Sequence, residues 1–341
     1  MTRFAFVVPV ADGPIERGRV PSFSVVVAAY QVATVIGEAI ESAFGQTLPP
    51  LEVIVCDDGS TDDLEAALAP YRDRITLLRK ENGGEASAKN VAARAARGDF
   101  VVILDADDVF LPKRLEALGE LAAARPDLDI LTTDATLEID GQVVRRCYTE
   151  LFRFEVADQR RGILEQNFIF GLAAVRRERL VEIGGLDESI RWTADWDCWL
   201  RMILAGSRAG LVADPLARYR LSEGSLSSQR EAHIQGRLTT LAKAERREDL
   251  SREERAVLER SVAYNRRALA LASARAALLE ARPDARRRAL AVTLGRGFGP
   301  RARAKSLAAA LAPSRARRRL AVQPRETTGG ILLPQEAGED F

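Results

Sequence analysis

The sequence predicts an α/β fold with a mostly parallel mixed sheet flanked by helices, followed by a helical carboxyl-terminal extension. Three observations support this prediction. Apolar runs alternate with helical stretches over residues 23–104, which is typical of βαβ units. Two of these runs end abruptly in aspartates. From residue 228 the composition shifts to Ala, Leu, Arg and Glu with few helix breakers.

The alternating elements follow one another as strand, helix, strand, helix. Strands are expected at 23–30, 51–56, 75–78 and 100–104, and helices at 36–44, 64–69 and 86–96. In the first of these helices Ile36, Ile40 and Phe44 recur at helical spacing. Connections of this kind place successive strands parallel in one sheet.

The strand at 100–104 runs without a break into three carboxylates, Asp105, Asp107 and Asp108. Clustered carboxylates at the end of a buried strand are tolerated when solvent, a cation or protonation relieves their repulsion. Aspartate oxygens are natural ligands of Mg²⁺ and Mn²⁺, which proteins often share with a substrate diphosphate. The pattern favours a metal-diphosphate site, and the alternative is a solvated aspartate-rich turn.

The strand at 51–56 ends in the same manner, in Asp57 and Asp58, before a turn with helix N-cap chemistry. Ligands of open parallel sheets gather beyond the carboxyl ends of the strands. Tyr30, Asp57 and the aspartates at 105–108 are therefore expected to face one crevice. A nucleotide pocket requires such a shared location.

Three segments together resemble the nucleotide-sugar domain of glycosyltransferase family 2. They are 24–63, 81–108, and GGLDESIRWTADWDCWLRM at 184–202, and their order and spacing cover about 200 of the 341 residues. The resemblance implies a GT-A fold and an inverting, metal-dependent transfer of sugar from a nucleotide-diphosphate donor, with UDP-sugars favoured. The implied acceptor is a carbohydrate or lipid-linked hydroxyl, in cell-surface polysaccharide or glycolipid assembly.

The resemblance also assigns the donor site. Ala28 and Tyr30 occupy the positions that contact the nucleotide base, and Asp57 the position that accepts a hydrogen bond from the base imide. Lys89 occupies the position of a basic residue beside the base and diphosphate. For Tyr30 the alternative is a place at the edge of the core, and for Lys89 a solvated helix position.

Asp105, Asp107 and Asp108, called the acidic strand end, complete the implied donor site. By the resemblance, Asp105 lies near the ribose and sugar, and Asp107 coordinates the Mg²⁺ or Mn²⁺ that bridges the diphosphate. Asp108 either assists them or only caps the following turn.

The later motif supplies the implied catalytic base. Inverting transfer needs a base opposite the departing diphosphate to take the proton of the acceptor hydroxyl. Asp195 matches the family's base, but the acidic residue that usually precedes it is Ala194 here. This departure bears on base tuning or acceptor handling. Asp197 is a competing candidate, with capping or surface exposure as its alternatives.

The three tryptophans lie around this base. Trp192 and Trp196 are candidates for the acceptor region, because an aromatic ring offers a platform for a sugar face. Trp196 and Trp199 are three residues apart, a helical spacing that equally fits packing against the sheet. Core packing is favoured for Trp199.

A second departure falls in the segment 219–227, which resembles the family's segment that closes over the diphosphate. That segment commonly carries a histidine near the position of Ser222, and here the single histidine is His233. Arg220 could help to neutralise the diphosphate instead, and a plain surface loop is the alternative.

Length, cysteines and hydropathy agree with a cytoplasmic enzyme. The 341 residues suffice for one large α/β core with an extension. Cys56, Cys147 and Cys198 form an odd set without metal-ligand spacing, which favours reduced thiols. No stretch approaches the roughly 20 apolar residues of a spanning helix, and the amino terminus makes a poor signal peptide.

Charge is segregated along the chain. Residues 281–320 hold twelve Lys or Arg and one acid, whereas 321–341 hold one Arg and four acids. Three roles remain open for the basic segment: peripheral contact of 301–320, through Leu307, Leu311 and Leu320, with the cytoplasmic face of a membrane; a flexible or intramolecular role; and, least favoured, attraction to nucleic acid.

The expected organisation is a lead segment at 1–20, a GT-A domain at 21–227, a helical and increasingly basic extension at 228–320, and a disordered tail at 321–341.

Two other functions remain open. A noncatalytic nucleotide-sugar or glycan-binding module would keep the donor crevice without turnover. A nucleotidyltransferase would also use Mg²⁺ and carboxylates on an α/β sheet, but no glycine-rich triphosphate loop follows the first strand.

Overall fold

The chain divides into two compact units. The computed structural model describes residues 4–11, 13–150, 152–221 and 230–322. The sheet unit comprises Met1–Ile163 and Asn167–Leu221, and the helical unit comprises Leu164–Gln166 and Ser222–Phe341. The expected boundary at 227 and the tail from 323 lie outside the described residues.

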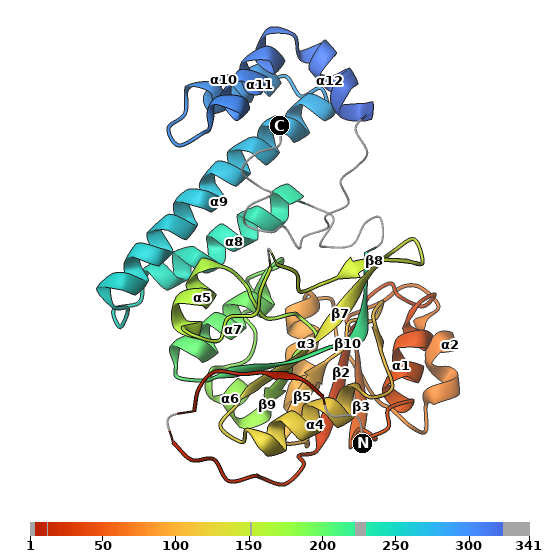
Figure 1. Cartoon of the computed structure of the whole chain (residues 1–341). Helices are drawn as coiled ribbons and strands as arrows, with labels where there is room; N and C mark the ends of the chain where they lie inside the picture. Colours follow the sequence, from red (N-terminus) through yellow and green to blue (C-terminus); the bar gives the residue numbers. More distant parts are fainter. Residues whose placement is uncertain (1–3, 12, 151, 222–229, 323–341) are drawn as a thin grey trace. The chain divides into compact units, whose positions relative to one another are not determined.

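The sheet unit is built on one sheet with strand order β1, β10, β7, β9, β5, β2, β3, β4, while β6 pairs with β10 and β8 with β7 (Figure 1). The strands are β1 Phe6–Val7, β2 Phe23–Ala29, β3 Glu52–Asp57, β4 Thr76–Arg79, β5 Phe100–Ile103, β6 Val109–Phe110, β7 Ile130–Ile139, β8 Gln142–Arg146, β9 Ala174–Arg176 and β10 Ala209–Leu221. Strand β1 belongs to the expected lead segment, so part of that segment joins the sheet.

The predicted parallel strands are confirmed. β2 pairs in parallel with both β3 and β5, and β3 pairs in parallel with β4. β9 is antiparallel to β5 and β7, which makes the sheet mixed. Ala29 and Asp57 are partners at the carboxyl ends of β2 and β3, so the loops that follow these strands emerge side by side.

Helices flank this sheet (Figure 1). They are α1 Ile36–Phe44, α2 Leu64–Leu68, α3 Glu85–Ala95, α4 Arg114–Ala124, α5 Gln159–Glu165, α6 Arg177–Glu182 and α7 Ala194–Leu204, with a 3₁₀ turn at Ala69–Tyr71. Ile36 and Ile40 of α1 are buried, as their helical spacing predicts. Cys56, Cys147 and Cys198 are buried free thiols.

The helical unit contains α8 Arg230–Glu245, α9 Arg252–Leu279, α10 Ala285–Leu294, α11 Pro300–Leu311 and α12 Pro313–Val322. The expected helical extension is interrupted before α9, because Ser251 and Glu254 form a capping box that starts a new helix. Among the described residues, no helix combines the length and the apolarity that crossing a membrane requires.

Candidate active site

The carboxyl end of β3 presents a buried aspartate. Asp57 is the last residue of β3. Its Oδ1 accepts the main-chain N–H of Ser60 at 2.8 Å, and its Oδ2 lies 3.4 Å from Nε of the exposed Arg79. A carboxylate has lone pairs to spare beyond these contacts, so Asp57 can accept a further hydrogen bond from a ligand.

The carboxyl end of β2 lies beside it. Ala28 is half-buried, and Tyr30 is 50% exposed, so half of the Tyr30 surface is open to a ligand. The adjacent Gln31 accepts the main-chain N–H groups of Thr61 and Asp62 at 2.9 and 3.0 Å. These bonds join the loops that follow β2 and β3.

Asp58 has a structural role that the sequence did not reveal. Its buried carboxylate lies 2.7 Å from Nζ of Lys80 and accepts the main-chain N–H groups of Gly83 and Gly84 at 3.0 and 2.7 Å. Gly84 has a φ of 91°, in the left-handed region that favours glycine. The turn that begins α3 is therefore held against the end of β3.

Lys89 of α3 links this turn to the acidic strand end. It is buried and forms ion pairs with Glu85 and with Oδ1 of Asp105, the latter at 2.6 Å. Burial alone would lower the pKa of Lys89, but the attraction of Asp105 and Glu85 raises it above its ordinary value. Lys89 is thus a buried cation, and the alternative of a solvated helix position is wrong.

The remaining carboxylates of the acidic strand end are poorly compensated. Burial and repulsion from Asp105 raise the pKa of Asp107 to about 6. Asp108 is buried, and burial followed by repulsion from its two neighbours raises its pKa well above the usual value. Its Oδ1 accepts the main-chain N–H of Arg220 at 2.8 Å, whereas its Oδ2 has no hydrogen-bond partner among the described residues.

Asp195 lies in the first turn of α7 and is held from a distant segment. Nδ2 of Asn167 donates to its Oδ2 at 3.0 Å. Burial raises the pKa of Asp195 to about 6. Lys89 lowers that pKa, while Glu85 and Asp105 raise it, so Asp195 lies within the electrostatic reach of the donor-site charges. The expected base therefore lies close enough to Asp105 for the two charges to interact.

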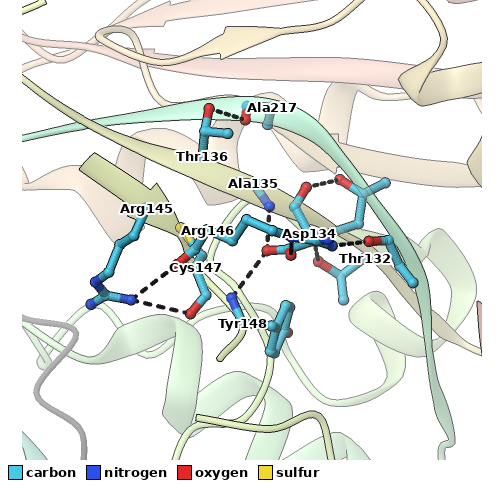
Figure 2. A network of polar contacts seen from close by, with 11 residues as sticks. Thr132, Asp134, Ala135, Thr136, Arg145, Arg146, Cys147, Tyr148 and Ala217 are labelled. Atoms are coloured by element: carbon cyan, nitrogen blue, oxygen red, sulfur yellow. Dashed lines mark hydrogen bonds and ion pairs between the residues drawn. The ribbon is translucent and has the colours of Figure 1, made fainter. Parts of the chain in front are cut away.

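A polar network supports the segment that carries Asn167. Asp134 of β7 accepts the main-chain N–H groups of Ala135 and Tyr148 at 2.7 and 3.0 Å, and Nε of Arg146 lies 2.6 Å from its other oxygen (Figure 2). The Tyr148 hydroxyl then donates to the carbonyl of Phe168 at 2.8 Å. The chain next to Asn167 is therefore anchored to the sheet. Sequence reasoning missed Asn167, because no local motif marks a contact across 28 residues.

The tryptophans around Asp195 have different surroundings. Trp196 is buried, and its indole N–H donates to the carbonyl of Ile163 at 2.8 Å, so the structure does not support an acceptor contact for it. Trp199 is fully buried, as expected. Trp192 is half-buried, with the guanidinium of Arg191 5.2 Å from its ring centroid.

Asp197 is a structural residue. It is buried rather than exposed, and its Oδ2 lies 2.7 Å from Nε of Arg201. Arg201 in turn donates to the carbonyls of Ile183 and Gly185, each at 2.7 Å. This chain of contacts fastens the GG turn to α7, so Asp197 is not the better candidate for the base.

Arg220 forms ion pairs with carboxylates of the protein itself. Its Nη2 lies 2.7 Å from Glu38 and its Nε 3.5 Å from Glu138. A role in neutralising a diphosphate would therefore require Arg220 to exchange these partners. The expected closing segment continues into Ser222, which lies outside the described residues, and His233 belongs to α8 of the helical unit.

The fold and the motifs both match known proteins. The model of the family described as Glycosyl transferase family 2 matches residues 24–184. These residues have the sequence pattern of a glycosyl transferase family 2 domain. An uncharacterized glycosyltransferase of Rickettsia prowazekii is 30% identical to this chain over 192 residues, or 55% of this chain and 60% of the relative. The chain thus spans less than two thirds of that relative. The sequence resemblance is confirmed.

Two further relatives are similar to this chain over a comparable length. The succinoglycan biosynthesis protein ExoO of Rhizobium meliloti is 32% identical over 222 residues, or 61% of this chain and 63% of that protein. The hyaluronan synthase of Pasteurella multocida is 31% identical over 204 residues, which make up 58% of this chain and 20% of the synthase.

Solved structures confirm the GT-A fold. A mannosyltransferase of Pyrobaculum calidifontis superposes with a TM-score of 0.59 at 23% identity, covering 96% of this chain and 89% of that chain. TarS of S. aureus superposes with a TM-score of 0.55 at 19% identity, covering 88% of this chain and 90% of that chain.

Proposed function

We propose that the protein is an inverting, metal-dependent glycosyltransferase that uses Asp195 as its base. One observation carries this proposal. Lys89 forms an ion pair with Asp105, and the charges of both residues act on the pKa of Asp195. A base with a pKa of about 6 is deprotonated at neutral pH and still able to accept a proton in the transition state.

The donor is a nucleotide-diphosphate sugar. Ala28 and Tyr30 would contact the base, and Asp57 would accept the hydrogen bond of its imide. Among the structures that share the fold, TarS was crystallised with UDP and with UDP-GlcNAc, and the mannosyltransferase with GDP-Man and Mn²⁺. Those complexes support the donor class, while the preference for a UDP-sugar comes from the motif resemblance.

A divalent cation, Mg²⁺ or Mn²⁺, fits the acidic strand end as a shared ligand. Among the described residues, no three His, Cys, Asp or Glu side chains converge into an all-protein metal cage. Burial, followed by repulsion from Asp105, raises the pKa of Asp107, and a buried oxygen of Asp108 has no hydrogen-bond partner within the described ranges. Asp107 would hold the cation through its carboxylate oxygens. When bound, the cation stabilises negative charge on the leaving diphosphate.

Transfer moves one proton and exchanges one bond. The acceptor oxygen attacks the anomeric carbon as the bond from that carbon to the diphosphate breaks, and Asp195 takes the proton of the acceptor hydroxyl. Attack from the face opposite the leaving group inverts the anomeric configuration. Lys89 adds positive charge on the donor side, and Asn167 holds the Asp195 carboxylate in place through its Oδ2.

The acceptor is a carbohydrate or lipid-linked hydroxyl, and Trp192 is the residue proposed to contact it. Trp192 lies three residues before Asp195 and keeps part of its ring exposed. The hyaluronan synthase and the succinoglycan biosynthesis protein support a role in cell-surface polysaccharide or glycolipid assembly.

Incubation with a panel of nucleotide sugars, with Mn²⁺ or Mg²⁺ and simple sugar acceptors, tests the proposal. The expected result is release of a nucleoside diphosphate with one donor and a product of inverted configuration by NMR. A product of retained configuration, or release of pyrophosphate from a nucleoside triphosphate, would contradict it.

The second candidate is a noncatalytic nucleotide-sugar-binding module, favoured by Ala194 in the position of the family's usual acid. The module binds the same donor with the same affinity but never releases the diphosphate. Donor binding without turnover by the wild-type chain over the whole acceptor panel would establish it.

A further inference from the structure

The last three helices form a small bundle with an unusual outer face. α10 and α11 make an antiparallel hairpin, because Nε of Arg286 donates to the carbonyl of Ala310 at 3.1 Å and Nε of Arg303 to that of Thr293 at 2.9 Å. Small side chains fill the core between this hairpin and α9, including Ala274, Ala277, Ala289, Val292, Ala309 and Ala310.

Leucines project from the opposite side of this hairpin. Leu290 and Leu294 of α10 are 41% and 77% exposed, and Leu307 and Leu311 of α11 are 42% and 70% exposed. The two leucines of each pair are four residues apart and therefore share one side of their helix. The buried residues of that helix lie on its other side, so the leucines face away from the core. Leu320 is buried in the bundle core, so the expectation that it faces a leaflet is wrong. The pair on α10 is exposed instead.

The charge of these helices has one sign. Residues 285–322 contain eleven Lys or Arg and no Asp or Glu. On α12, Arg315, Arg317, Arg318 and Arg319 are all exposed. The three helices contain no carboxylate that could neutralise them, so their net positive charge favours an anionic partner.

We propose that the outer face of α10, α11 and α12, called the basic face, binds an anionic lipid bilayer. The leucines would enter the boundary between headgroups and acyl chains, while the arginines pair with lipid phosphates. Nucleic acid would satisfy the arginines but leave the paired leucines in water. A second copy of the chain would bring like charges together, because the face has no carboxylates. Both observations favour the lipid surface.

Co-sedimentation of the full chain with vesicles tests this proposal. The chain is expected to bind vesicles of mixed phosphatidylcholine and phosphatidylglycerol, to bind pure phosphatidylcholine weakly, and to dissociate as salt is raised. The double variant Arg317→Gln/Arg318→Gln should lose roughly 10- to 30-fold in partitioning, since each basic residue near the surface contributes about fivefold. The double variant Leu294→Ser/Leu311→Ser should lose roughly tenfold.

Matched variants on other surfaces keep the test specific. Arg252→Gln/Arg260→Gln removes two exposed arginines of α9, and Leu51→Ser/Val181→Ser removes two exposed apolar residues of the sheet unit. These controls should bind vesicles like the wild type, and all variants should keep their circular dichroism spectra.

Four results would overturn the proposal. The first two are equal binding to neutral and anionic vesicles, and equal losses of binding in the control variants. The third is binding to duplex DNA that the leucine substitutions do not change, with no binding to vesicles. The fourth is a dimer that the leucine substitutions dissociate. Lipid binding does not require sugar transfer, so the two proposals can fail separately.

Discussion

The side-chain amide of Asn167 donates to Oδ2 of Asp195 at 3.0 Å, while the Oδ1 of Asn167 accepts the main-chain N–H of Ile169 at 3.4 Å. The second bond fixes which end of the amide faces the aspartate. Asn167 thus supplies a neutral hydrogen-bond donor near the base in a chain that has Ala194 in the position of the usual acid. The base is thus held by a distant segment as well as by the main-chain N–H of its neighbour Trp196.

Replacing Asn167 should therefore change the pH dependence of transfer. The amide stabilises the charged carboxylate, so Asn167→Ala should raise the pKa of Asp195 above its value of about 6 and move the acidic limb of the pH–rate profile to higher pH. Because the variant loses a hydrogen bond to a charged group, its turnover at neutral pH should be about tenfold slower. The exposed Gln142→Ala is the control. An unchanged acidic limb would show that the amide does not tune the base.

Replacing Lys89 should affect two carboxylates at once. Lys89 lowers the pKa of both Asp107 and Asp195, so Lys89→Met should raise both and shift the acidic limb upward. The variant also leaves Asp105 without its cation, and a lower melting temperature is expected. Glu85→Gln is the comparison, because it removes a carboxylate that raises both pKa values and should shift the limb the other way.

Asp107 carries the prediction about the cation. Calorimetric titration with UDP should show binding that depends on Mn²⁺ in the wild type, and Asp107→Asn should weaken it at least about tenfold by removing the anionic ligand. Because the Asp107 carboxyl has a pKa of about 6, protonation should weaken Mn²⁺-dependent binding as the pH falls through 6. Asp62→Asn, on the neighbouring loop, is the control. Equal UDP affinity with and without Mn²⁺ would exclude a bridging cation.

The two tryptophans before and after Asp195 should behave differently. Trp196 is buried and hydrogen-bonded, so Trp196→Phe should lower stability by about 1–3 kcal/mol without changing the KM for the acceptor. Trp192→Ala should raise the acceptor KM with little loss of stability. Thermal unfolding and acceptor titrations on both variants separate the two roles, and the reverse pattern would move the acceptor site.

Much of the fold was predictable because its signals are local. The apolar runs ending in Asp57 and Asp105 marked two parallel strands and the edge where a ligand would lie, and the structure confirms those strands. Strand β9 escaped prediction because its three residues carry no usable periodicity. The break before Ser251 was missed, although the capping box of Ser251 and Glu254 is legible in the sequence.

The site was predictable where a motif carries it and not where the contact is long-range. Asp195 was assigned from its motif and stays a prediction, whereas its contact with Asn167 depends on how two distant segments meet. Trp196 and Asp197 were candidates because they follow Asp195 closely in the sequence. Both are buried, and they contact Ile163 and Arg201, respectively. Sequence proximity to a base does not show which neighbours turn toward the ligand, because successive helical residues point in different directions.

The most direct test of the account is Asp195→Asn, with donor affinity and single-turnover transfer measured on the same sample. General-base removal should slow transfer by about 10²- to 10⁴-fold while donor affinity stays within about threefold of the wild type. Burial raises the pKa of Asp195 to about 6, so above that pH the folded protein bears the cost of a buried charge. The neutral amide removes this cost, and the melting temperature at pH 8 should therefore rise. Transfer at the wild-type rate by a folded Asp195→Asn chain would contradict the assignment of the base.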